Sequence, residues 1–99
     1  MNLKTKIAIR HEQTMRETRA LTEARAVYTE MLHGVLQEAR GCGISVQPRE
    51  VGKWDLCRLG RSCIVWANAY GIHVTPQDLS LKTHTTIDEL TTTLAEILA

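Results

Sequence analysis

The feature that most constrains the fold is a series of helix boundary signals in the second half of this 99-residue chain. Asp55 can cap a helix over residues 55–71, and Gly71 stands at the glycine position that commonly follows a helix. Apolar side chains in this segment recur at helical spacing, and they are Leu56, Leu59, Cys63, Trp66 and Tyr70. We therefore predict a second helix over residues 55–71.

A short third helix is predicted after a turn through residues 72–74. Thr75 can accept a hydrogen bond as the cap, and Pro76 follows at the first helical position, where its missing N–H costs nothing. Asp78, three residues after the cap, completes a capping box. These signals predict that the third helix begins at Thr75.

The last helix has equally clear signals. Thr85 or Thr86 can cap it, with Asp88 or Glu89 three residues later. Its predicted buried stripe consists of Ile87, Leu90, Leu94, Ile97 and Leu98. We expect this helix to close the domain.

The first half of the chain predicts one long helix and one long loop. Apolar residues recur at steps of three and four from Leu21 to Ala39, and the glycines that follow, Gly41 and Gly43, end the helix. Residues 1–20 are predicted to be an N-terminal arm or the exposed start of this helix. Residues 44–54 lack helical periodicity and are predicted to be a crossing loop.

The predicted fold class is all-α. Residues 21–99 form a single helical domain, a small four-helix bundle with a long first helix, a long loop, a second helix, a short third helix and a closing helix. A net charge of +1 disfavours a strongly basic nucleic-acid coat, and no apolar run approaches the roughly 18 residues of a membrane span. We expect a cytoplasmic protein.

The second half of the chain resembles the acyl and peptidyl carrier proteins. The matching segments are Gly71-Ile72-His73-Val74, Thr75-Pro76-Gln77-Asp78-Leu79 and Thr86-Ile87-Asp88-Glu89-Leu90. The resemblance implies the carrier fold, in which a serine after an aspartate at the start of the second helix holds phosphopantetheine. Here the aspartate matches Asp55 and the serine position falls on Leu56, which cannot accept the group.

A non-catalytic adaptor is therefore the favoured function, with no cofactor and no metal. The family's second helix is acidic, whereas this one is basic, so we expect it and the preceding loop to bind a protein partner. The predicted partner-binding residues are Lys53, Trp54, Asp55, Arg58 and Arg61. The long first helix also leaves room for pairing with a second copy.

Two alternatives remain open. Ala67 and Gly71 have the spacing of a helix-turn-helix, with residues 74–81 as recognition helix, which would make the chain a small DNA-binding regulator. That helix has no Lys or Arg before Lys82, which follows it, so nucleic acid is not favoured. A second register places Ser62 at the carrier serine, so a true carrier would hold phosphopantetheine on Ser62.

The three cysteines are not predicted to form disulfides or a metal site. Cys57 and Cys63 lack the Cys-x-x-Cys spacing of zinc ligands, and an odd number of cysteines, with Cys42, argues against a disulfide framework. We expect all three to be small buried side chains. No nucleophile, histidine pair or phosphate loop occurs in a recognisable motif, so the chain is predicted not to be an enzyme.

Overall fold

The protein combines two helices with one antiparallel sheet. The structure, a computed structural model, describes residues 2–77 and 80–99. The elements in chain order are α1 (Leu3–Gly41), β1 (Ser45–Glu50), β2 (Lys53–Arg58), β3 (Arg61–Asn68), β4 (Gly71–Pro76), β5 (Lys82–His84) and α2 (Ile87–Leu98). The strands pair with their sequence neighbours in the order β1-β2-β3-β4-β5. The fold class is therefore α+β, and the predicted all-α four-helix bundle is wrong.

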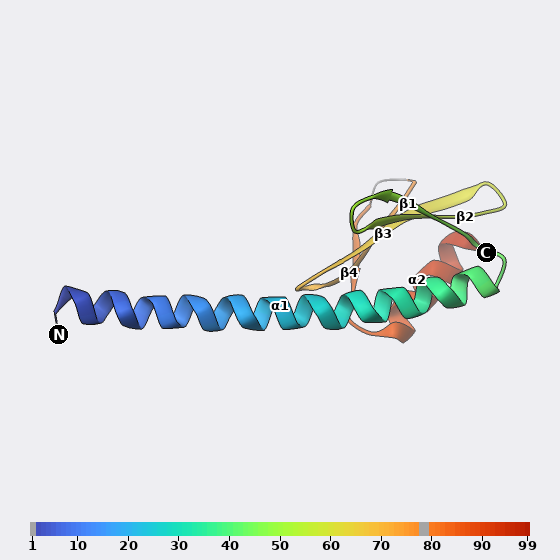
Figure 1. Cartoon of the computed structure of the whole chain (residues 1–99). Helices are drawn as coiled ribbons and strands as arrows, with labels where there is room; N and C mark the ends of the chain where they lie inside the picture. Colours follow the sequence, from blue (N-terminus) through green and yellow to red (C-terminus); the bar gives the residue numbers. More distant parts are fainter. Residues whose placement is uncertain (1, 78–79) are drawn as a thin grey trace.

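The molecule is elongated because α1 is much longer than the rest of the fold. Its extents are 64 × 25 × 24 Å. The sheet lies across the C-terminal part of α1, and α2 packs on the same side of the sheet as α1 (Figure 1). The two chain ends lie at opposite ends of the molecule (Figure 1). One half of α1 thus belongs to a packed domain, and the other half extends away from it.

The predicted second helix is instead a β-hairpin. β2 ends at Arg58, which pairs with Arg61 at the start of β3, and only two residues connect the strands. These two residues have positive φ values, +52° for Leu59 and +80° for Gly60. Such a pair of left-handed residues is the turn that suits the twist of a two-residue hairpin. The chain therefore reverses at Gly60, within the segment predicted to be a continuous helix.

Alternate residues of the hairpin face the helices. Leu56, Cys63 and Val65 are almost fully buried, whereas Leu59 is 84% exposed and Tyr70 is 70% exposed. The residues that suggested a helical stripe thus divide between the core, two turns and, for Trp66, the other face of the sheet. Burial in this segment alternates with a period of two, as is typical of strands. This alternation and the β-branched residues favour a hairpin over the predicted helix.

The resemblance to carrier proteins is also wrong, because the second and third helices that it requires are absent from the described residues. Asp55 lies in the middle of β2, where it pairs with Gln47 and Ile64. Thr75 and Pro76 end β4 and begin no helix, while Asp78 lies outside the described residues. The predicted loop over residues 44–54 contains β1 and the start of β2.

The last helix and the end of the first are confirmed. Thr86 caps α2, and its hydroxyl oxygen accepts a hydrogen bond from the Glu89 amide at 3.3 Å. Leu90, Leu94 and Leu98 are buried as predicted, but Ile87 is 47% exposed. At the other helix, Gly43 takes a φ of +82°, and the amide of the next residue donates back to the Ala39 carbonyl at 3.1 Å. This arrangement is a Schellman cap.

One hydrophobic core joins the two helices and the sheet. α1 contributes its last turns, the sheet contributes one face, and α2 contributes its leucine stripe. The buried apolar residues are Leu32, Val35, Leu36, Ala39, Val46, Leu56, Cys63, Val65, Ile72, Val74, Leu90, Leu94 and Leu98. Burial of this set is the main favourable contribution to folding.

The three thiols are expected to differ sharply in reactivity. Cys63 is 3% exposed, and burial, with the nearby Asp55 carboxylate, raises the pKa of its thiol to about 11. Cys42 and Cys57 are exposed, contrary to the sequence prediction, which holds only for Cys63. Because the thiolate is the reactive form, a disulfide reagent near pH 8 should modify two thiols quickly and the third only after unfolding. Three rapid reactions in the folded protein would contradict the position of Cys63.

Candidate partner-binding surface

The N-terminal half of α1 projects beyond the packed domain (Figure 1). Every residue from 2 to 23 is exposed, and burial begins only at Ala24. We call residues 3–23 the projecting segment. At about 1.5 Å per residue it extends roughly 30 Å from the domain. Residues 2–23 are the longest uninterrupted run of exposed residues in the part of the chain that the structure describes.

The projecting segment lacks the packing that stabilises most protein helices. Helices in proteins derive most of their stability from an apolar face packed on other elements. Within the segment, Thr14, Thr18 and Thr22 each donate a hydroxyl hydrogen bond to the carbonyl four residues earlier, at 2.8–3.0 Å. Such bonds slightly destabilise and bend helices. An added partner surface would therefore stabilise this half of α1.

A periodic stripe connects the projecting segment with the core. Alternate steps of four and three residues back from Val35 define this stripe, which consists of Val35, Met31, Tyr28, Ala24, Leu21, Glu17, Thr14, Arg10, Ile7 and Leu3. This spacing is typical of helices that pair with other helices. Tyr28, Met31 and Val35 pack in the domain, whereas Leu3, Ile7 and Leu21 are 73%, 59% and 44% exposed. The stripe thus continues beyond the part that the domain covers.

The two ends of the stripe carry opposite charges. Residues 2–11, which we call the tip, contain Lys4, Lys6 and Arg10 and no acidic residue. Residues 27–38, where α1 enters the domain, contain Glu30 and Glu38 and no lysine or arginine. The free end of α1 is therefore basic, and where the helix enters the domain Glu30 and Glu38 form an acidic stretch between Arg25 and Arg40.

A shallow groove lies at this acidic end. It has a volume of about 350 Å³, and we call it the basal groove. It is formed between α1 and the first residue of α2 by Val27, Glu30, Met31, Gly34, Val35, Glu38 and Ile87. Apolar side chains thus form the groove together with two carboxylates, and Val27 and Ile87 are each about half exposed.

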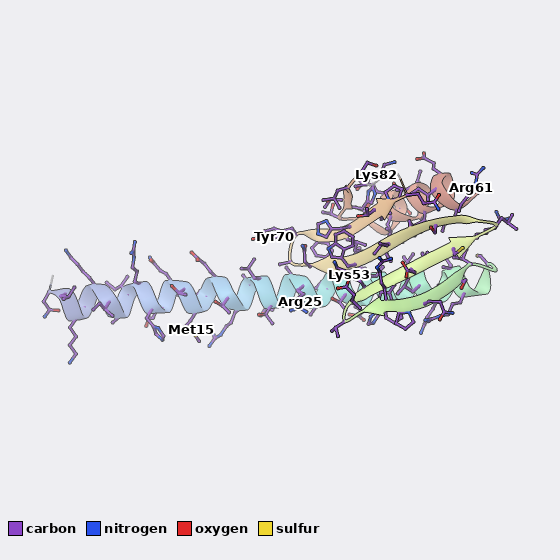
Figure 2. All side chains as sticks on the ribbon, turned by 90° about the horizontal axis from the view of Figure 1, so that it is seen from above. Met15, Arg25, Lys53, Arg61, Tyr70 and Lys82 are labelled. Atoms are coloured by element: carbon purple, nitrogen blue, oxygen red, sulfur yellow. The ribbon has the colours of Figure 1, made fainter. Side chains whose placement is uncertain are left out.

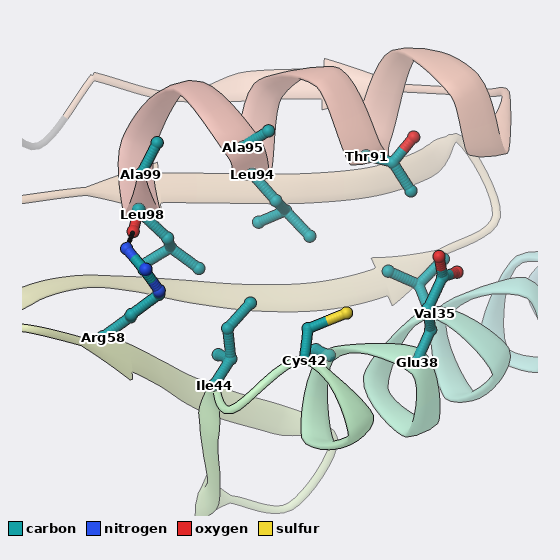
Figure 3. Close-up of a pocket in the computed structure, with 11 residues that line it drawn as sticks. Val35, Glu38, Cys42, Ile44, Arg58, Thr91, Leu94, Ala95, Leu98 and Ala99 are labelled. Atoms are coloured by element: carbon teal, nitrogen blue, oxygen red, sulfur yellow. Dashed lines mark hydrogen bonds between the residues drawn. The ribbon is translucent and has the colours of Figure 1, made fainter.

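A second groove, of about 460 Å³, lies farther along the two helices (Figure 3). It is mainly apolar, with Ile44, Leu94 and Leu98 among its lining residues. At one end, Arg58 Nη1 donates a hydrogen bond to the Leu98 carbonyl at 3.1 Å (Figure 3). This bond joins β2 to the last turn of α2, so Arg58 has a structural partner within the domain.

The sheet face opposite the helices is polar with one aromatic row. Figure 2 shows this face, with α1 passing behind the strands. Lys53, Trp66 and His73 are neighbours across β2, β3 and β4. Lys53 Nζ lies 5.2 Å from the centre of the Trp66 ring, and the centres of the Trp66 and His73 rings are 5.4 Å apart. His73 Nδ1 lies 2.9 Å from Thr83 Oγ1, and burial lowers the pKa of His73, which favours the neutral imidazole. The row thus joins four strands by cross-strand contacts.

The residues predicted to bind a partner do not form one surface. Lys53 and Asp55 lie on the open face of the sheet, where Asp55 accepts a hydrogen bond from Arg49 at 3.2 Å. Trp54 lies on the helix side, with its ring 6.3 Å from His33, and Arg58 also points there. Arg61 begins β3 beside the hairpin turn. The basic helix predicted to unite them is two strands.

The structural contexts of the two alternative functions are also corrected. Ser62 lies within β3, where its hydroxyl accepts a hydrogen bond from Gln77 Nε2 at 3.2 Å, so it does not begin a helix. Ala67 lies in β3, and Gly71 begins β4. The predicted recognition helix over residues 74–81 starts with the end of β4. Neither the carrier motif nor a helix-turn-helix is present in the described part of the chain.

The sequence analysis allowed the first helix to pair with a second copy but did not identify the stripe that runs through its first 23 residues. Leu3 and Ile7 are four residues apart, and Leu21 follows Ile7 after two heptads. This spacing is a detectable signal. Polar residues between them, Arg10 to Arg19, made this segment resemble a frayed arm. Repeating the heptad count from Val35 back to Leu3 would have identified it.

Two general features can be stated for residues 2–77 and 80–99. There, no group of three or more His, Cys, Asp or Glu side chains could hold a metal ion. α1 is long enough to cross a bilayer but too polar, and α2 is too short, so neither helix qualifies as a membrane span.

Comparisons of the chain with protein-family models, with curated proteins and with solved structures found no match.

Proposed function

We propose that this chain is a non-catalytic protein-binding module that docks through the projecting segment of α1. The observation that carries this proposal is the exposure of every residue of the segment, together with a stripe spaced for helix pairing. The packed domain holds one end of the helix, and the partner covers the other. The basic second helix of the sequence prediction has no part in this proposal.

The composition of the segment favours a protein as partner. The segment carries five basic residues against three acidic ones, a net charge of +2 that is small for a nucleic-acid surface; they are Lys4, Lys6, Arg10, Arg16 and Arg19, and Glu12, Glu17 and Glu23. Of its large apolar residues only Leu3, Ile7 and Leu21 lie on the stripe, so it lacks the wide apolar face that inserts into a membrane surface. A helix with a narrow stripe and mixed charges is suited to pair with another helix.

Photo-crosslinking from the stripe tests the proposal. A photoreactive residue at Leu21, in the full chain expressed in its own cell, should give covalent products with protein. Met15 is the matched control, because it is 46% exposed against 44% for Leu21 and lies about 120° away around the helix. We expect strong crosslinking at Leu21 and little at Met15. Equal yields at both positions, no product at Leu21, or products with nucleic acid alone would contradict the proposal.

A further inference from the structure

Building on the proposed function, we propose that the partner is a second copy of this chain, paired antiparallel, with the tip of each α1 seated in the basal groove of the other copy. The two surfaces are far apart in one chain, at the free end of α1 and beside the domain (Figure 1). They are brought together only when two chains run in opposite directions. The resulting dimer has two identical contacts, as a two-fold axis requires.

Charge complementarity is the first argument for this arrangement. The tip has three basic residues and no acidic residue, while residues 27–38 have two acidic residues and no basic one. Antiparallel pairing places Lys4 and Lys6 near Glu30 and Glu38 of the partner subunit. Parallel pairing would instead place the two basic tips together and the two acidic segments together, which is unfavourable.

Apolar complementarity supports the same direction. The tip presents Leu3 and Ile7, which are 73% and 59% exposed, and the basal groove presents Val27 and Ile87. Val35 is only 4% exposed, so the exposed residues of the groove make the contact, and Leu3 then lies near Gly34 of the partner subunit and Ile7 near Val27 of the partner subunit. The apolar side chains at both ends are then removed from water.

Gly34 provides an independent argument. It lies inside α1, where glycine is less favourable than alanine, yet among the described residues a Cβ at this position would meet no heavy atom within 4 Å beyond its chain neighbours and the adjacent backbone of its own helix. The packing of the chain itself therefore does not require glycine here. Because Gly34 lines the basal groove, the missing side chain leaves space for the close approach of a second helix.

The proposal predicts how charge reversal changes dimerisation. Sedimentation equilibrium of the full chain should show a dimer for the native sequence. Lys4→Glu with Lys6→Glu, or Glu30→Lys with Glu38→Lys, should each raise the dissociation constant about tenfold or more, because like charges then face each other. All four substitutions together should restore dimerisation, since the charges are complementary again. Rescue of this kind requires tip and groove to face each other.

Two controls separate this contact from general effects. Arg16→Glu with Arg19→Glu changes the net charge as much as the tip variant but lies on the other side of α1, so dimerisation should be nearly unchanged. Gly34→Ala favours the helix, so it should fold at least as well as the native chain, yet it should weaken the dimer severalfold by filling the groove.

Specific outcomes would overturn the inference. A native chain that is monomeric at all concentrations would do so. Unchanged dimerisation in both charge variants, or a quadruple variant that does not dimerise, would also overturn it. A monomer whose Leu21 photo-crosslinks to a different protein would overturn the second-copy inference and leave the proposed function standing. The two proposals therefore fail in distinguishable ways.

Discussion

Leu56→Ala should lower the free energy of unfolding by about 2–5 kcal/mol, the range for removing a buried leucine side chain. Leu56 is fully buried at the centre of the sheet, where it pairs with Val46 on one side and Cys63 on the other. The truncation removes apolar contact and leaves a cavity between the sheet and the helices. Urea unfolding, followed by far-ultraviolet circular dichroism, measures the loss.

Leu59→Ala is the matched control for that experiment. Leu59 is 84% exposed in the turn between β2 and β3, so its truncation should change stability by no more than about 0.5 kcal/mol. In the predicted helix, both leucines would lie on one buried stripe and both truncations would be costly. Similar losses for Leu56→Ala and Leu59→Ala would therefore favour that helix and contradict the sheet.

Gly71→Ala should destabilise the protein by about 3 kcal/mol or more, because backbone strain and a steric clash add together. Gly71 begins β4 with a φ of +145°, and a Cβ there would lie 2.6 Å from the carbonyl oxygen of His84. That oxygen belongs to β5, which pairs with β4 at this point. The alanine side chain would thus push the edge strand away from the sheet. Thermal or urea unfolding measures the effect.

Gly60→Ala provides the comparison for Gly71. Gly60 also has a positive φ, +80°, but a Cβ there would meet no heavy atom of the described residues within 4 Å. Only the strain of the left-handed conformation remains, about 1 kcal/mol. If Gly71→Ala lowered the free energy of unfolding by no more than Gly60→Ala does, this result would contradict the close contact between β4 and β5.

The two helices were predictable because each has apolar residues at helical spacing and a capping signal at one end. Thr86 caps α2, and Gly43 takes the left-handed conformation that ends α1, as the sequence indicated. The hairpins were missed because their turn signals are weak. Leu59-Gly60 lacks the asparagine or aspartate that usually marks such a turn, and Leu56, Leu59 and Cys63 happen to follow helical spacing.

The candidate site was harder to predict than the helices. Lys53 and Arg58 are close in sequence, but strand alternation places them on opposite faces of the sheet, so a basic cluster in the sequence is not one in space. The basal groove combines residues of α1 with Ile87, which is almost 50 residues later in the chain. Only the tertiary structure brings those elements together. The stripe of α1, by contrast, is local and was detectable from the sequence.

An antiparallel dimer would give the elongated shape of this chain a clear role. The domain anchors α1 and forms the groove, and the projecting segment supplies the complementary tip. The two domains would then lie at opposite ends of the paired helices, each with the Lys53–Trp66–His73 face of its sheet uncovered. Those faces would remain accessible in the assembly.

Distances between spin labels test the central claim most directly. Cysteines are introduced singly at Leu3 or Ala20 after Cys42 and Cys57 are replaced by serine, while buried Cys63 remains unlabelled. With Leu3 near Gly34 of the partner subunit, labels at position 3 should lie about 45 Å apart along the helices. Labels at position 20 should be separated by little more than the roughly 10 Å between two packed helices. Short separations at both positions, or no dipolar coupling at either, would contradict the antiparallel pairing of the projecting segments.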